Sequence, residues 1–186
     1  MLETLQQIDT SIFYFINVTL SNSITDFIMP LITYDKGLRN IYALAMIILL
    51  WKGDKKMRWM VLGSVVVLVL TDQISAGLLK NWIGRMRPCH VFDLNSIHLL
   101  VDCGGGKSMP SAHAANAFGQ AVYFSIFYKQ PRVYLFVYAT LIALSRVFVG
   151  VHYFSDILVG SMIGVFAGVL IAHLFERVYN SFEISK

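Results

Sequence analysis

The chain has 186 residues, of which 56% are hydrophobic and 14% are charged, and it carries a formal charge of +4. Soluble domains carry about 25% charged residues, so this composition excludes an ordinary soluble domain and favours a chain embedded in a bilayer. The basic residues form short clusters between apolar runs, unlike the continuous basic face of a nucleic-acid-binding protein, and no nucleic-acid partner is expected.

The N-terminal segment has no basic region. Glu3 and Asp9 are acidic, so we expect no cleavable signal peptide. No low-complexity tract, flexible linker or long charged tail interrupts the chain. We therefore expect residues 1–186 to form a single integral-membrane domain.

Apolar segments predict an all-α, polytopic membrane bundle with about six transmembrane helices, because a crossing needs about 20 mostly apolar residues. The first segment, 10–34, is the weakest, since polar residues and Pro30 interrupt it. It is either a broken or kinked first span or an amphipathic helix lying on the membrane surface. The stronger segments cover residues 38–52, 57–79, 110–128, 132–150 and 155–178.

The basic residues between the spans indicate the orientation in the membrane. If the spans alternate, eight basic residues lie at one face and seven at the other. Lys80, Arg87 and Arg146 are candidates for a ligand site, and without them the comparison becomes eight against four. The positive-inside rule then makes the eight-residue face cytoplasmic. This predicts an inner-membrane protein with both termini in the cytoplasm and the other face in the periplasm.

Polar segments concentrate at that outer face. They are Lys80–Pro88 after the third span, Pro110–His113 at the start of the fourth, and Ser145–Asp156 between the fifth and sixth. Because the spans were drawn from hydropathy alone, this coincidence is an independent reason to expect one shared site.

Three cations in these segments predict an anion site. Crowding Lys80, Arg87 and Arg146 together is costly unless an anion lies between them, since each pair of unit charges at about 4 Å interacts by about 4 kcal/mol near a protein surface. The hydroxyl of Ser111 and the backbone N–H of Ala112, at the start of a helix, can donate to the same anion. The alternative is a set of cations at membrane ends whose charged groups reach for water.

A histidine pair supplies the chemistry. His152 and Asp156 are four residues apart, so the carboxylate can hold one ring nitrogen and leave the other as a nucleophile. His113 then acts as general acid and later as base. A metal site is the alternative for His152 and Asp156, but a third ligand beyond His113 is lacking and the cations repel a metal. We expect neither metal nor other cofactor.

The motifs Lys-x6-Arg-Pro, Pro-Ser-x-His and Ser-Arg-x5-His-x3-Asp, in this order, resemble those of the type 2 phosphatidic acid phosphatase superfamily. The resemblance implies a six-span helical fold with a core shared with haloperoxidases. It also implies metal-independent hydrolysis of a membrane lipid phosphate through a phosphohistidine. By this resemblance His152 is the nucleophile, Asp156 its orienting partner and His113 the general acid and base. The implied phosphate-binding residues are Lys80, Arg87, Ser111, Ala112 and Arg146.

One position departs from the family. Ala112 stands where members usually have glycine. A left-handed backbone there would cost alanine about 1 kcal/mol or more, but its N–H stays available, so we expect activity to be retained.

Bacterial members of this size resemble lipid A 1-phosphatases, phosphatidylglycerophosphate phosphatases and undecaprenyl-pyrophosphate phosphatases, which the motifs do not separate. A lipid-to-lipid phosphotransferase and a non-catalytic lipid-phosphate binder or transporter are alternatives. The histidine pair argues against a mere binder, and the spans argue against the soluble haloperoxidase branch.

Other polar residues bear on the surroundings of the site. Asp72, inside the third span, either supports Lys80 two turns later or makes a structural pair. Cys89 and Cys103 lie in the loop over 88–109, where an oxidising compartment would allow a disulfide, with two reduced thiols as the alternative.

Two patterns concern helix packing. Asn116 and Gln120 are expected to make interhelical hydrogen bonds. Gly160, Gly164 and Gly168 recur every four residues, which predicts close helix packing within the bundle or in a dimer, with packing within the bundle favoured. The oligomeric state is left open.

Overall fold

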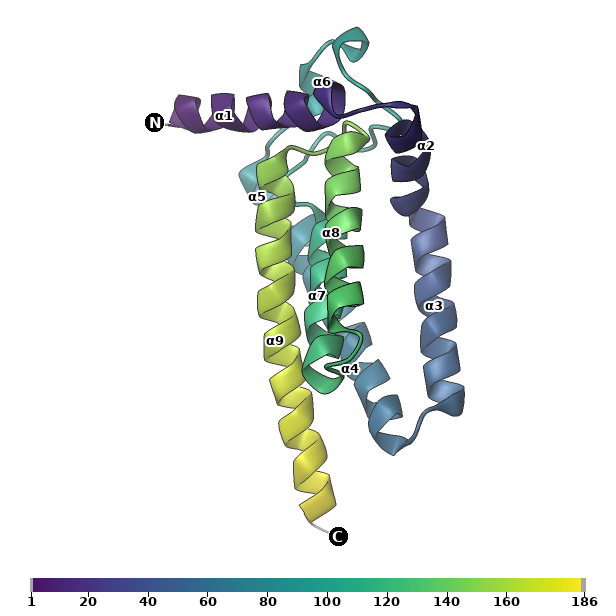
Figure 1. Ribbon diagram of the computed structural model, residues 1–186. Coiled ribbons are helices and arrows are strands. Elements are labelled where there is room, and N and C mark those ends of the chain that lie inside the picture. The colour runs from purple at the N-terminus through teal and green to yellow at the C-terminus, as the bar shows by residue number, and fades with distance from the viewer. Residues whose placement is uncertain (1, 185–186) are drawn as a thin grey trace.

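The apolar segments form helices that run alongside one another in the computed structural model, which describes residues 2–184 (Figure 1). Short π-helical turns, η1 (Phe15–Thr19) and η2 (Gln73–Leu79), and a 3-10 turn, η3 (Leu94–Ser96), lie between α-helices. The α-helices are α1 (Leu2–Tyr14), α2 (Ser23–Ile32), α3 (Asp35–Lys52), α4 (Lys55–Asp72), α5 (Lys80–Ile83), α6 (Pro88–Val91), α7 (Ala112–Phe127), α8 (Arg132–Phe148) and α9 (Phe154–Ile184).

Helices of membrane-spanning length confirm the expectation of an all-α membrane bundle. Lys55–Ile83 and Phe154–Phe182 are each long and apolar enough to cross a bilayer. A third candidate is the pair Glu3–Thr19 and Ser23–Ile32, which is bent by 111°. Helices α7 and α8 have 16 and 17 residues, or about 24–26 Å, which is shorter than the hydrocarbon core of about 30 Å.

The N-terminal segment is broken between η1 and α2, and whether it spans the membrane or lies on its surface stays a prediction. Asn22 caps α2, accepting hydrogen bonds from the N–H groups of Ile24 and Thr25. Before this break α1 lies across one end of the bundle, whereas α2 and then α3 run along it (Figure 1). The two ends of the described chain lie at opposite ends of the bundle (Figure 1). The sequence predicted that both termini share one membrane face, and the face that each terminus occupies stays a prediction.

A buried asparagine holds this break against the rest of the bundle. Asn17 donates to the carbonyls of Val147 and Phe148 at the end of α8 and to that of His98, whose N–H donates back. Gly150 has a φ of +83°, and a Cβ there would lie 2.7 Å from the His98 carbonyl oxygen. Glycine thus allows the loop after α8 to approach the loop before α7 closely.

Helices α7 and α9 pack without intervening side chains. A Cβ on Gly160 would collide with the carbonyl of Ser111, and one on Gly164 with the carbonyl of Ala115. Gly168 contacts α7 in the same way one turn later. This confirms the interpretation that the glycine repeat packs helices within the bundle, and it holds the first turns of α7 and α9 side by side.

Hydrogen bonds join α4 to α7, as the sequence predicted. Thr71 donates to the Asn116 side chain at 2.6 Å. The Ser64 hydroxyl donates to Oε1 of the Gln120 side chain at 2.9 Å, and Nε2 of the same side chain donates to the Ser64 backbone carbonyl at 2.9 Å. Each such bond inside a membrane bundle contributes about 1 kcal/mol, so they fix the register of α7.

Candidate active site

His152 lies in the loop between α8 and α9 and is almost fully buried. Its Nδ1 donates to Asp156 Oδ2 at 3.2 Å, and the backbone N–H of Tyr153 donates to the same oxygen at 2.9 Å. Asp156 stands in the first turn of α9 and is also buried. The contact holds the proton on Nδ1 and leaves Nε2 with its lone pair.

Burial keeps this imidazole neutral. Removal from water lowers the pKa of His152 to about 3, the hydrogen bond to Asp156 opposes the shift, and Arg146 and Arg87 add to it. A neutral ring with a fixed tautomer is the form that can attack an electrophile.

Two of the three cations named from the sequence, Arg87 and Arg146, interact electrostatically with His152, and the third, Lys80, interacts with both of them. Lys80 begins α5, Arg87 precedes α6 and Arg146 lies in the last turn of α8. Arg146 donates through Nη1 to Thr33, while its buried Nε has no hydrogen-bond partner among the described residues. A buried N–H without a partner is costly, and an anionic ligand would satisfy it.

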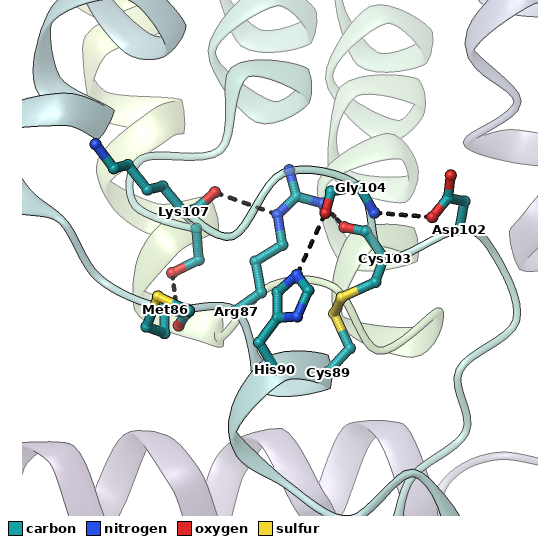
Figure 2. Close-up of a disulfide and its surroundings, with 9 residues drawn as sticks. Met86, Arg87, Cys89, His90, Asp102, Cys103, Gly104 and Lys107 are labelled. Atoms are coloured by element: carbon teal, nitrogen blue, oxygen red, sulfur yellow. Dashed lines mark hydrogen bonds between the residues drawn. A yellow bond between two sulfur atoms is a disulfide. The ribbon is translucent and has the colours of Figure 1, made fainter.

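A disulfide loop holds Arg87 in place, as Figure 2 shows. Cys89 and Cys103 form the disulfide. The carbonyl of Cys103 accepts from Arg87 Nη1 at 2.6 Å, and the carbonyl of Lys107 accepts from its Nε at 3.2 Å. Cys89, His90 and Cys103 lie close enough together to bind a metal ion. The disulfide leaves neither cysteine with a free thiol for this.

Ser111 and Ala112 form the start of α7. Ser111 is buried, its N–H donates to the Asp156 carbonyl at 3.0 Å, and its Oγ has no hydrogen-bond partner among the described residues. Ala112 is the first residue of the helix, and no described non-glycine residue has a positive φ. The left-handed conformation that would penalise alanine is therefore not adopted here. The first N–H groups of α7 have no acceptor within the helix, which suits an anion.

His113 belongs to the next position of α7 and pairs with a residue that the sequence did not indicate. Its Nε2 lies 2.7 Å from Oδ1 of Asp35, the first residue of α3. Electrostatic interactions connect His113 with Arg146 and Lys80, so it faces the same cluster.

Asp72 lies at the edge of this cluster. It ends α4, its side chain is exposed, and its carboxylate interacts electrostatically with Lys80. Whether it supports Lys80 or has a merely structural role stays a prediction.

The sequence profile described as the PAP2 superfamily matches residues 59–179, well over half of the chain. The chain belongs to the PAP2 superfamily. This confirms the family predicted from the three motifs.

Relatives in the PAP2 superfamily act on membrane lipids. The chain is 34% identical to the lipid A 4'-phosphatase of Bacteroides thetaiotaomicron, over 93% of this chain and 80% of that protein. It is 27% identical to the lipid A 1-diphosphate synthase of Escherichia coli, over 96% of this chain and 81% of that protein. Several other curated relatives are longer, and the chain spans about half of their length.

A solved PAP2 structure has the same fold. The transmembrane PAP2-type phosphatidylglycerolphosphate phosphatase of Bacillus subtilis superposes with a TM-score of 0.73 at 23% identity, over 94% of this chain and 88% of that one. At this identity the likeness concerns the fold alone.

Residues beside the PAP2 motifs complete the site, and sequence reasoning did not assign them. Arg85 donates to Asp156 at 2.9 Å and to Asp9 at 2.7 Å. Arg85 lies between Lys80 and Arg87 in the sequence, and this position was a usable signal. For Asp9 and Asp35, both far from the motifs in sequence, no signal in the sequence indicated contact with the site.

Proposed function

We propose that this PAP2 protein is a lipid phosphatase that hydrolyses a phosphate monoester or pyrophosphate on a membrane lipid through a phosphohistidine at His152, without a metal ion. The observation that carries the proposal is a buried histidine held by Asp156, within electrostatic range of Arg87 and Arg146, which in turn interact with Lys80. The relatives' names favour a lipid A or phosphatidylglycerophosphate substrate, and an undecaprenyl-pyrophosphate type of substrate has the same reacting group.

The reaction begins with attack by His152. Its Nε2 lone pair forms a bond to phosphorus while the bond from phosphorus to the lipid oxygen breaks, and His113 gives its proton to that oxygen. Water then attacks phosphorus, His113 takes the water's proton, and the P–N bond breaks to return the electron pair to Nε2. Phosphate and a dephosphorylated lipid are released, and both histidines regain their starting states.

The cation cluster stabilises charge during both steps. Lys80, Arg87 and Arg146 face the equatorial oxygens of the pentavalent phosphorus, and the planar guanidinium groups suit two oxygens at once. Ser111 Oγ and the first N–H groups of α7 donate to the same oxygens. The unpartnered Ser111 Oγ and Arg146 Nε support this assignment.

A metal ion at His152 and Asp156 fits this arrangement poorly. Both carboxylate oxygens of Asp156 already accept hydrogen bonds, from His152, Tyr153 and Arg85. The surrounding positive charges also oppose a divalent cation.

We propose a membrane arrangement as well, in which α2 with α3, α4 with α5, α7, α8 and α9 each cross the bilayer. The site then lies at one membrane face, with α1 along that face as a surface helix. The far end carries Lys52, Lys55, Lys129 and Arg132, which supports a cytoplasmic position, and the disulfide supports an oxidising compartment at the site.

Labelling tests this orientation. An impermeant maleimide should label Asn95→Cys in intact spheroplasts and Lys129→Cys only after permeabilisation, with the unsubstituted chain as control. The reverse pattern would overturn the orientation and leave the chemistry untouched.

Phosphate release from purified protein tests the activity. The substrates are lipid A, phosphatidylglycerophosphate and undecaprenyl pyrophosphate, each presented in mixed micelles. His152→Ala should abolish release and His173→Ala, an exposed histidine on α9, should not. EDTA should leave the rate unchanged and vanadate should inhibit. Near-normal release by His152→Ala, or EDTA inactivation reversed by a divalent metal, would overturn the proposal.

A phosphotransferase is the second candidate, because one relative is a lipid A 1-diphosphate synthase. In that reaction a lipid oxygen replaces water as the acceptor from the phosphohistidine. Labelled phosphate recovered in a lipid product, and not as free phosphate, would favour transfer.

A further inference from the structure

Helix α1 covers the site end of the bundle and sends one buried carboxylate toward it. Asp9 is buried, although its neighbours on α1 are largely exposed. Its Oδ1 accepts the Ser155 N–H at 2.9 Å, and its Oδ2 accepts from the Ser155 hydroxyl and from Arg85 Nη2. Both carboxylate oxygens are thus engaged, by α9 and by the segment between α5 and α6.

Arg85 bridges this carboxylate to that of Asp156. Its Nη2 lies 2.7 Å from Asp9 Oδ2, and its Nη1 lies 2.9 Å from Asp156 Oδ1 and 2.6 Å from the Ser155 hydroxyl. The guanidinium also stacks on Tyr153, 3.8 Å from the ring centre. A planar fork with separate donors can hold two carboxylates in this way, whereas a lysine ammonium presents a single point charge.

The bridge determines which oxygen of Asp156 faces His152. Arg85 occupies Oδ1, so Oδ2 remains for His152 Nδ1 and the Tyr153 N–H. Without Arg85 the carboxylate could rotate about its last bond, and the imidazole would lose its fixed orientation.

Asp9 also matters for charge. The negative charge of Asp9 balances Arg85, so Asp156 retains a net negative charge for His152. That charge is needed when phosphorylation of Nε2 makes the ring cationic. If Asp9 were neutral, Arg85 would compete with His152 for Asp156.

We propose that Arg85 and Asp9 are positioning residues for this reaction, acting through Asp156 on His152, and that α1 is consequently part of the active site. The inference rests on the proposed function, in which His152 attacks phosphorus.

Steady-state kinetics on the purified full chain test the inference with Arg85→Gln, Asp9→Asn and the double variant. Each single variant should lower kcat by between about tenfold and about a thousandfold, less than loss of the orienting carboxylate itself, with KM within about twofold. The double variant should lose little more than the worse single variant, since both act along one path. Arg85→Lys should lose activity to an intermediate degree.

Matched controls remove a charge elsewhere. Glu3→Gln lies on the same helix as Asp9, and Arg132→Gln removes an exposed arginine from the far end of the bundle. Both should keep kcat and KM. The midpoint of thermal unfolding in detergent, measured for every variant, separates loss of fold from loss of positioning.

Unchanged kcat in Arg85→Gln and Asp9→Asn would overturn the inference, as would losses that multiply in the double variant. Losses that disappear when the assay temperature is kept well below each variant's unfolding midpoint would show a purely structural role and overturn it as well. An inactive His152→Ala beside a fully active Arg85→Gln would remove this inference alone, whereas an active His152→Ala would remove the proposed function.

Discussion

Among the histidine–carboxylate pairs of the described residues, the pairs of His152 and of His113 differ in how they are held. His152 and Asp156 come from one short stretch of chain, and their side chains are 2% and 0% exposed. His113 and Asp35 come from separate helices, and their side chains are 21% and 63% exposed. One pair, called the sealed pair below, is closed off from water, while the other, called the open pair, is partly exposed to water through Asp35.

The difference matches two chemical tasks. A nucleophile that becomes covalently modified needs one tautomer and one direction of attack, which burial and a local partner provide. A general acid and base must exchange protons with a leaving group and with water in each turnover, which requires access. Under the proposed function the sealed pair therefore attacks, and the open pair transfers protons.

The largest effect is expected at the sealed pair. Asp156→Asn keeps the shape but lets the amide hold the wrong tautomer of His152, so kcat for phosphate release should fall about 10⁴-fold. Asp93→Asn, in the loop between α6 and α7, is the matched control. A loss below about tenfold would mean that Asp156 does not orient the nucleophile.

A smaller and substrate-dependent effect is expected at the open pair. His113→Gln should lower kcat about 10²- to 10³-fold for a lipid alkoxide, which needs a proton to leave. With an aryl phosphate, whose leaving group needs little help, the first step should be nearly normal in a single-turnover experiment. Equal losses for both leaving groups would contradict the role of His113 as the acid.

Acid should destabilise the folded protein through the sealed pair. The folded-state pKa of His152 is lowered to about 3 from an ordinary value of 6.5, so between these values the unfolded chain binds a proton that the folded chain does not. Stability should therefore fall as pH falls through this window, by about 2 kcal/mol between about pH 7 and about pH 5. Thermal unfolding in detergent measures this. His152→Gln should flatten the dependence and the exposed His173→Gln should not.

The smallest effect is expected at the exposed carboxylate. Asp35→Asn removes a charge that favours protonated His113, but water can replace part of that interaction, so kcat should fall only about three- to tenfold. A loss as large as that of Asp156→Asn would erase the distinction between the pairs. Kinetic measurements on both variants in the same detergent decide this.

The sequence predicted the bundle because its signals are local. Runs of apolar residues gave 57–79, 132–150 and 155–178, close to α4 with η2, α8 and α9. The N-terminal segment was harder, since its course depends on Asn17 and Asn22, whose partners set the 111° bend. Hydropathy carries no information about such an angle.

The same distinction between local and long-range signals applies to the residues of the site. His152 and Asp156 are four positions apart, so their pairing could be predicted from a short stretch of sequence. The glycine repeat that packs α9 on α7 is equally local. The pairing of His113 with Asp35, and of Arg85 with Asp9, joins parts of the chain that only the folded bundle brings together. Asp35 and Asp9 belong to no recognisable sequence motif.

The contacts of Asp9 have a consequence for biosynthesis. Asp9 leaves the ribosome before its partners Arg85 and Ser155, because both follow it in the sequence, and Ser155 belongs to α9. The hydrogen-bond circuit around Asp156 therefore closes only after α9 has been inserted. A growing chain that still lacks α9 lacks the carboxylate that holds His152, so under the proposed function dephosphorylating capacity requires the insertion of α9.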